Sequence, residues 1–107
     1  MLFRSSLRFL LSVIMVEYKI KPRLFGNPDR LQDPTKPLNI GVKTITASNL
    51  TDLKAKVHEW LMDNQIGAGN WGDTPVYKNL KILGYMSYNG RVWDRTIWDA
   101  NAKEIKD

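Results

Sequence analysis

The chain has 107 residues, of which 43% are hydrophobic and 25% charged, and these are the proportions of one ordinary globular domain rather than of a disordered chain. Its net charge of +5 favours an acidic partner such as nucleic acid, an anionic membrane or an acidic protein, without selecting one of them. The lack of cysteine and the single histidine exclude disulfides, thiolate nucleophiles, cysteine-based metal sites and multi-histidine zinc sites.

Residues 1–14 differ from the rest of the chain, because they contain Arg4, Arg8 and three serines but no acidic residue. Their apolar run is far shorter than the ~20 residues that cross a bilayer, so no membrane span is predicted. Three interpretations stay open: a reading frame that starts too early, with Met15 as the true first residue; a mitochondrial-type presequence; or a secretory signal without a small-residue cleavage site. The first is favoured and predicts a cytoplasmic protein. Each excludes the segment from the domain, and the loss of its two arginines lowers the net charge from +5 to +3.

The domain is predicted over residues 15–98 and begins with a strand. Val16, Tyr18 and Ile20 alternate with charged residues, the period of two that is typical of a half-buried strand. Pro22 lacks a backbone donor, so it either ends this strand or places it at a sheet edge.

A long loop and a second strand follow. Residues 26–37, here called the proline loop, are rich in proline, glycine, asparagine and aspartate and show no periodicity. Loops of this length are either functional or loosely ordered. The second strand is predicted over residues 38–46, with Ile40, Val42 and Thr44 on one face.

The clearest predicted element is an amphipathic helix that begins near residue 50. Asn49 or Thr51 is placed to cap its start, and Asp52 adds a negative charge where the helix dipole favours one. Gly67 is predicted to stop the helix. The apolar stripe that would face a sheet consists of Leu50, Leu53, Val57, Trp60 and Leu61.

Three further strands are predicted, over residues 75–78, 81–88 and 91–94. Asn89-Gly90 is the strongest short hairpin signal, because both central positions of a two-residue turn need a positive φ. The predicted order β-β-α-β-β-β indicates an α+β fold, a small antiparallel sheet with one amphipathic helix packed on one face. Residues 99–107 form a polar C-terminal tail that is expected to fray.

Residues 67–72 (GAGNWG), here called the glycine loop, match the G-x-G-x-x-G string of dinucleotide-binding proteins. In those proteins the glycines leave a strand and open a helix whose N-terminus binds the pyrophosphate. Here the string follows a helix and leads into a strand, so nucleotide binding is disfavoured and no cofactor is predicted. Two interpretations of Trp71 stay open. It folds back onto the core, as large aromatic side chains more often do, or it is displayed as a recognition side chain.

The C-terminal hairpin is the strongest candidate for a binding surface. A two-residue turn would set Tyr88 opposite Arg91 and Met86 opposite Trp93. If their face is exposed, its aromatic rings and cations fit single-stranded nucleic acid; if it is inward, it is core. The inward arrangement is favoured, because strands prefer aromatic residues in any case. One predicted face holds Ile82, Met86, Tyr88, Arg91, Trp93 and Arg95, and the other holds Leu83, Tyr85, Ser87, Val92 and Asp94.

No motif in the sequence predicts catalysis. His58 stands alone on the helix, since the metal-binding H-E-x-x-H pattern needs a second histidine where Met62 stands. No carboxylate is paired in sequence with an evident nucleophile. A small hydrolase or transferase with an oxygen-ligated metal is therefore the weakest of three hypotheses.

The favoured hypothesis is a non-catalytic module that binds a protein through the proline loop, Trp71 or an open sheet edge. The size and composition are typical of small accessory proteins of phages and mobile elements. The alternative is a nucleic-acid-binding domain that uses the basic and aromatic hairpin. The candidate binding residues are Trp71, Lys78, Lys81, Tyr88, Arg91, Trp93 and Arg95, and neither a metal ligand nor an oligomeric state is predicted.

Overall fold

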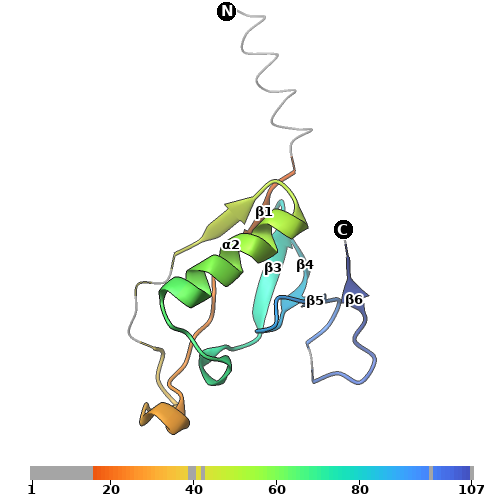
Figure 1. Ribbon diagram of the computed structural model, residues 1–107. Coiled ribbons are helices and arrows are strands. Elements are labelled where there is room, and N and C mark those ends of the chain that lie inside the picture. The colour runs from red at the N-terminus through yellow and green to blue at the C-terminus, as the bar shows by residue number, and fades with distance from the viewer. Residues whose placement is uncertain (1–15, 39–40, 42, 97, 107) are drawn as a thin grey trace, which may run out of the picture.

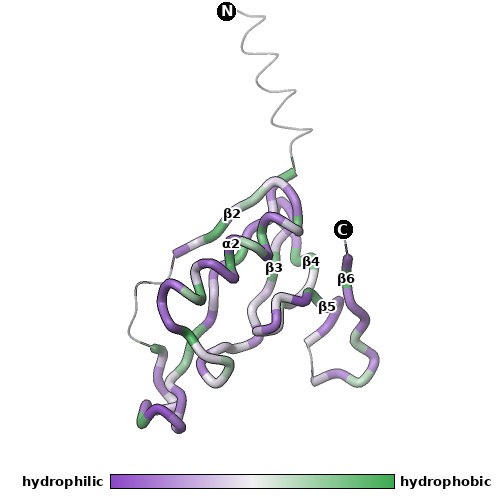
Figure 2. Tube along the Cα trace, in the orientation of Figure 1, coloured by the Kyte–Doolittle hydropathy of each residue, from purple (hydrophilic) through white to green (hydrophobic). Residues whose placement is uncertain are grey.

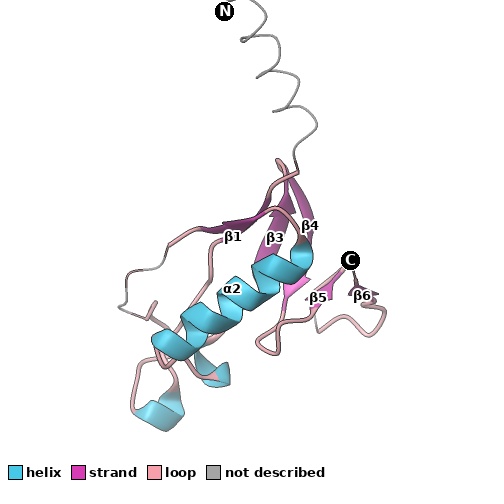
Figure 3. Cartoon of the chain, turned by 45° about the horizontal axis from the view of Figure 1, so that its top comes forward, coloured by secondary structure: helices cyan, strands magenta, loops and turns pink. Residues whose placement is uncertain are grey.

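The computed structural model describes residues 16–38, 41, 43–96 and 98–106. An α-helix packs on one face of a six-stranded antiparallel sheet with the strand order β2-β1-β3-β4-β5-β6 (Figures 1 and 3). This arrangement confirms the predicted α+β fold and adds one strand near the C-terminus. The elements in chain order are β1 (Tyr18–Ile20), the 3-10 helix η1 (Pro28–Arg30), β2 (Ile45–Ala47), α2 (Leu50–Asp63), the 3-10 helix η2 (Ala68–Asn70), β3 (Thr74–Lys78), β4 (Lys81–Met86), β5 (Val92–Trp93) and β6 (Glu104–Ile105).

The core lies between α2 and the sheet. Alternate residues of the strands point toward α2, and on β1, β3 and β4 these include Ile20, Val76 and Met86, all buried. The helix meets them with the predicted stripe, whose leucines and Val57 are buried, while Trp60 at its margin is half-buried. Each fully buried side chain of this size contributes about 1.5–3 kcal/mol. Apolar burial therefore holds the helix to the sheet.

The N-terminus of α2 is capped as the sequence predicts. Of the two candidate residues, Asn49 occupies the N-cap position, and its side-chain oxygen accepts a hydrogen bond from the Asp52 N–H at 2.8 Å. The Asn49 Nδ2 donates in return to the Asp52 carboxylate at 3.1 Å. A side-chain cap of this kind stabilises a helix by about 1 kcal/mol.

The helix ends before Gly67, so the predicted stop is wrong. The last helical residue is Asp63, and Gln65 adopts the left-handed conformation with φ 52°. The Ile66 N–H donates to the Leu61 carbonyl at 3.0 Å, which closes a Schellman motif. This motif usually places glycine at the left-handed position, so glutamine there left no recognisable stop signal.

Strand β2 is shorter than predicted. Within the expected strand over residues 38–46, the described residues Leu38, Gly41, Lys43 and Thr44 are not in a strand, and β2 spans Ile45–Ala47. Thr44 lies before the strand and is exposed, while Ile40 and Val42 lie outside the described residues. The proposed shared face of these residues therefore stays a prediction at two of its three positions.

The length of β2 is limited by a proline in its neighbour. Ile20 of β1 pairs with Ile45 of β2. Beyond Ile20, the next position of β1 that would donate its N–H to β2 is occupied by Pro22. Proline has no N–H, so the pairing stops at Ile20. Pro22 thus ends β1, which lies inside the sheet between β2 and β3 rather than at an edge.

The turn between β4 and β5 has three loop residues rather than two. The Ser87 N–H donates to the Arg91 carbonyl at 2.9 Å, so Arg91 lies opposite Ser87, and the predicted pairing with Tyr88 is wrong. Only Gly90 of this loop has a positive φ, at 85°, whereas Asn89 does not. The type I′ turn expected for Asn-Gly needs a positive φ at both, and a left-handed glycine after a type I turn is typical of three-residue hairpin loops.

The extra loop residue shifts the strand register by one. Met86 pairs with Val92, and Tyr85 pairs with Trp93, so the predicted pairing of Met86 with Trp93 is also wrong. Because successive side chains of a strand alternate in direction, a shift of one residue exchanges the two faces. Met86 and Val92 are buried beneath α2, and Tyr85 and Trp93 face away from it.

Part of the expected C-terminal tail belongs to the sheet. Glu104 and Ile105 form β6, which pairs with β5, and the Asp94 N–H donates to the Lys103 carbonyl at 2.9 Å. A side chain at Gly84 would collide with the Trp93 carbonyl, so the bare glycine is what lets β5 and β6 approach β4. Fraying is therefore not what the structure shows at residues 104–105.

Candidate functional site

A buried side chain joins the proline loop to the glycine loop. Asn70 is 0% exposed, and its Nδ2 donates to the Phe25 carbonyl and to Gln32 Oε1, both at 2.8 Å. Gln32 Oε1 also accepts from the Asn27 N–H at 2.9 Å. These bonds fix the proline loop, most of which is hydrophilic (Figure 2), against the glycine loop. We call these two loops and their hydrogen-bond network the loop pair.

Trp71 lies half-buried in the glycine loop and packs against the core. Its Nε1 donates to the Met86 carbonyl at 2.8 Å, so its one polar atom is bonded inside the domain. The loop opens only the short helix η2 and lacks the long helix that a dinucleotide-binding loop needs. This packing agrees with the first interpretation of Trp71, and a role in binding stays a prediction.

The two aromatic residues predicted for the hairpin surface lie on opposite faces of the sheet. Trp93 faces away from α2, and its Nε1 donates to Ser87 Oγ at 3.1 Å. The Tyr88 hydroxyl donates to the Ile66 carbonyl at 2.8 Å, and its ring packs against the core on the helix side. The predicted row of rings and cations on one face does not form.

The predicted cations are spread over different parts of the molecule. Lys78 and Lys81 are exposed on either side of the β3–β4 turn, and Lys78 Nζ lies 5.7 Å from the centre of an aromatic ring on β1. Arg91 is exposed beside the β4–β5 turn, and Arg95 forms an ion pair of 3.5 Å with the Asp99 carboxylate. The candidate residues do not converge on one site, and their roles in binding stay predictions.

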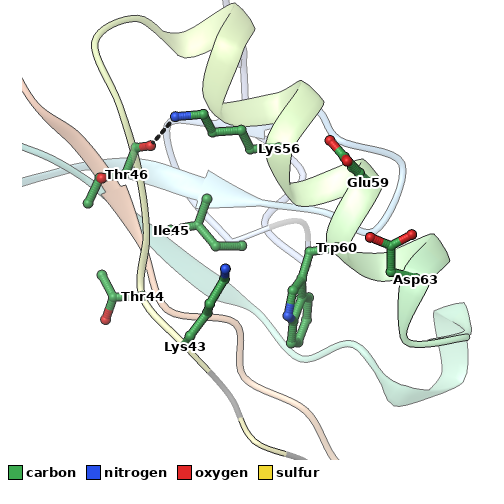
Figure 4. A pocket seen from close by; sticks show the side chains of 8 residues that line it. All are labelled: Lys43, Thr44, Ile45, Thr46, Lys56, Glu59, Trp60 and Asp63. Atoms are coloured by element: carbon green, nitrogen blue, oxygen red, sulfur yellow. Dashed lines mark hydrogen bonds between the residues drawn. The ribbon is translucent and has the colours of Figure 1, made fainter.

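A groove of about 400 Å³ lies between α2 and the segment that contains β2 (Figure 4). Trp60 extends from α2 into the groove, and Lys43 and Ile45 point into it from the other side (Figure 4). The sequence pattern assigns Trp60 to the core stripe, but the structure leaves it half-buried as a wall of the groove. The full lining consists of Lys43, Thr44, Ile45, Thr46, Lys56, Glu59, Trp60 and Asp63.

One peptide of β2 faces the groove without a neighbouring strand. β2 is the first strand of the sheet, so only one of its sides is paired. The Glu17 carbonyl accepts from the Asn79 N–H at 2.7 Å, so the odd-numbered residues of β1 point toward β3 and the even-numbered ones toward β2. Thr46 lies opposite Lys19, an odd-numbered residue, and therefore turns its N–H and C=O away from β1.

A lysine from the helix covers part of this free edge. Lys56 Nζ donates to the Thr46 carbonyl at 2.9 Å across the groove (Figure 4). Lysine beside an unpaired edge is a common way to limit unspecific strand pairing. The Thr46 carbonyl is thus occupied by a group that water or a ligand can replace, because Lys56 is exposed.

Charges of both signs surround the groove. Lys43 and Lys56 reach into it, and Glu59 and Asp63 lie one helical turn apart on α2 (Figure 4). Neither of the ion pairs found among the described residues involves any of them. The groove therefore offers a ligand an aromatic wall, a main-chain edge, and charged groups that have no ion-pair partner in the described chain.

Sequence reasoning did not single out this groove, because a strand's place at an edge depends on the order of strands in space. The available signal was local. Trp60 stands at the margin of the apolar stripe, with Lys56, Glu59 and Asp63 on its flanks. A large aromatic residue flanked by charged residues on a helix indicates a half-buried position. The same residue with only apolar neighbours would indicate full burial.

Within the described residues, no group of three or more histidine, aspartate and glutamate side chains could hold a metal ion. No helix in that part of the chain combines the length and apolar character needed to cross a membrane. Comparisons with protein-family models, with curated proteins and with solved structures find no match. The proposal of a function therefore depends on the groove and on the free edge of β2 beside it.

Proposed function

We propose that the chain is a non-catalytic module that binds an extended segment of a partner protein in the groove between β2 and α2. The observation that supports this proposal is the unpaired edge of β2 at Thr46, which faces a groove walled by a helix. An extended segment laid along such an edge adds a strand to the sheet, which is a recurring mode of peptide recognition.

Main-chain and side-chain contacts have separate roles in this mode. The Thr46 N–H and C=O bind the main chain of the added segment, which gives affinity for any sequence. Trp60 offers a large aromatic surface, and tryptophan is enriched among residues that dominate binding interfaces. Because side chains alternate along a strand, every second residue of the segment faces the side of the sheet on which Trp60 lies, and one of them contacts Trp60.

The charges in the groove indicate which side chains the segment carries. Lys56 has to leave the Thr46 carbonyl before an added strand can bond there. Once displaced, its ammonium group lies in the groove with that of Lys43, and an acidic side chain of the ligand would pair with both. The ligand class that fits is an extended segment with an apolar residue against Trp60 and an acidic residue near the lysines.

A random-peptide display library, selected on the folded full-length chain, supplies probes for this proposal. The selected peptides are expected to slow hydrogen exchange at the Thr46 amide, since that amide is the free donor of the edge. Trp60→Ala is expected to weaken their binding by about tenfold or more, or about 1.4 kcal/mol. Trp98→Ala is the matched control, because Trp98 is 84% exposed and does not line the groove.

Thr46→Pro tests the main-chain contribution separately. It removes the edge N–H at a position where proline is tolerated, because no neighbouring strand needs that donor. Peptides that bind Trp60→Ala and Thr46→Pro as tightly as the natural chain would overturn the proposal. Binding of single-stranded oligonucleotides that falls steeply with salt, and is reduced by Arg91→Ala with Arg95→Ala, would support the nucleic-acid alternative in its place.

A further inference from the structure

The sheet face opposite α2 carries aromatic side chains that no part of the core covers. Strand alternation sends Tyr77, Tyr85 and Trp93 to this face, together with Pro75 and Ile82. All of them are exposed or half-buried, and α2 packs on the other face (Figure 3). We call these residues, with Lys19 and Glu104 at their two ends, the open face. Partly exposed aromatic side chains that are neighbours on one sheet face are typical of an interaction site.

The open face contains two rows of cross-strand neighbours. One row runs from Thr46 on β2 through Lys19 on β1 and Tyr77 on β3 to Ile82 on β4. The other runs from Tyr85 on β4 through Trp93 on β5 to Glu104 on β6. Each row thus has an aromatic ring next to a charged residue, and these two charged residues, Lys19 and Glu104, are opposite in sign.

Lys19 and Glu104 are too far apart to form an ion pair within a single chain. Lys19 and Glu104 are both half-buried, and neither takes part in an ion pair among the described residues. Four strand spacings separate β1 from β6, or about 19 Å at ~4.8 Å per spacing. A two-fold axis that lies between the two sheets and runs roughly along β4 would set Lys19 of one copy against Glu104 of the other, and Tyr77 against Trp93.

We propose that the open face binds a second copy of this chain, as a two-fold symmetric dimer whose sheets pack face to face. Charge complementarity selects this occupant, because a two-fold axis forms the Lys19–Glu104 pair twice from one arrangement of residues. Sheets that pack face to face lie ~10 Å apart, a spacing that interdigitated tyrosine and tryptophan side chains fill. A nucleic acid would set phosphate against Glu104, which its charge disfavours.

Zero-length carbodiimide cross-linking of the full chain tests the contact directly. The reagent joins an amine to a carboxylate that touches it. In the dimer, the expected product links Lys19 of one chain to Glu104 of the other, and mass spectrometry of mixed isotope-labelled chains shows that the link joins two molecules. A separation of about 19 Å within one chain prevents the intramolecular product. A dimeric sample without this cross-link would overturn the proposal.

Sedimentation velocity tests the role of the charges. The natural chain is expected to form dimers at concentrations up to about 100 µM, and Lys19→Glu or Glu104→Lys alone is expected to weaken the dimer by about tenfold or more. The double variant restores a pair of opposite charges and is expected to recover dimerisation. A natural chain that stays monomeric, single variants that dimerise normally, or a double variant that is not rescued would each count against the proposal.

Two controls separate this interface from the others. Circular dichroism of each charge variant checks that it has folded. Trp60→Ala changes the groove between α2 and β2, away from the open face, and is expected to leave the dimer unchanged. If Trp60→Ala abolishes dimerisation while the charge reversals do not, the groove and not the open face holds the second copy.

Discussion

The helix-and-sheet body and the loop pair belong to the same domain, but different interactions hold them together. In the body, most of the side chains between α2 and the strands are apolar and buried. In the loop pair, the central side chain is Asn70, and it is held by hydrogen bonds to the Phe25 carbonyl and to Gln32. Strands and helices pair their own backbone groups, whereas irregular loops have no ladder for theirs. The difference teaches that a buried polar network can replace apolar packing where the backbone is irregular.

The largest effect is expected from truncating a core side chain of the body. Leu53 is 0% exposed, so Leu53→Ala leaves a cavity and is expected to lower the free energy of unfolding by about 2–5 kcal/mol. Urea denaturation measures this change. Met62→Ala on the same helix is the control, because Met62 is 51% exposed and should cost well under half as much. Equal losses for the two variants would show that burial under α2 does not stabilise the body.

The loop pair is expected to respond to the loss of a hydrogen-bonding group instead. Asn70→Ala removes the hydrogen bonds from the buried amide to the Phe25 carbonyl and to Gln32, and is expected to cost about 1–3 kcal/mol. Hydrogen exchange should quicken first at the Phe25 amide, which donates to the Asn70 carbonyl at 2.9 Å. Asn101→Ala, at an exposed asparagine, should change neither quantity. Unchanged exchange in Asn70→Ala would remove the distinction between the two regions.

A smaller effect is expected at the helix cap of the body. Asn49→Ala removes the acceptor for the Asp52 N–H and is expected to cost about 1 kcal/mol. Asn49→Ser keeps a side-chain oxygen and should retain most of the stability. Thermal denaturation distinguishes the two variants. A loss in Asn49→Ser as large as that in Asn49→Ala would show that the side-chain oxygen is not what caps the helix.

The smallest effect is expected in the proline loop at acidic pH. The Thr35 hydroxyl and then the Thr35 N–H donate to the Asp33 carboxylate, at 2.6 and 2.9 Å, and lower the pKa of Asp33 below its ordinary value of 3.8. The charged form is favoured by folding, so this contribution is complete above pH 3.8 and is lost as the pH falls through the lowered pKa. NMR titration of the carboxyl carbon follows it. Thr35→Val should bring the Asp33 pKa back toward 3.8, and Thr35→Ser should not.

The fold class, the helix and its cap could be predicted because their signals are local. The stripe that includes Leu53 and Val57 repeats at helical spacing, and Asn49 stands one residue before it. Strands β1, β3, β4 and β5 could be placed to within two residues for the same reason, whereas the strand predicted over residues 38–46 is found at Ile45–Ala47. What failed was decided by partners distant in the chain, such as Pro22, which shortens β2 from the neighbouring strand.

The remaining errors have physical causes that short patterns do not contain. The negative φ of Asn89 selects a three-residue loop, and no propensity distinguishes that loop from a two-residue turn with the same letters. Strand β6 is only two residues long, too short to show alternation. The groove and the open face depend on strand order and register, and for this reason Trp60, Lys19 and Glu104 carried no site signal in the sequence.

Pro22 also has a kinetic consequence for the proposed strand addition. Because it ends the β1–β2 ladder at the Ile20–Ile45 pair, Thr46 is the one residue of β2 whose peptide groups face the groove. A ligand there gains few main-chain hydrogen bonds, so its affinity depends mostly on side-chain contacts. Affinity differences between related complexes arise mainly from their dissociation rates. A complex formed at so short an edge should dissociate quickly, as in contacts that are made and released repeatedly rather than in a permanent assembly.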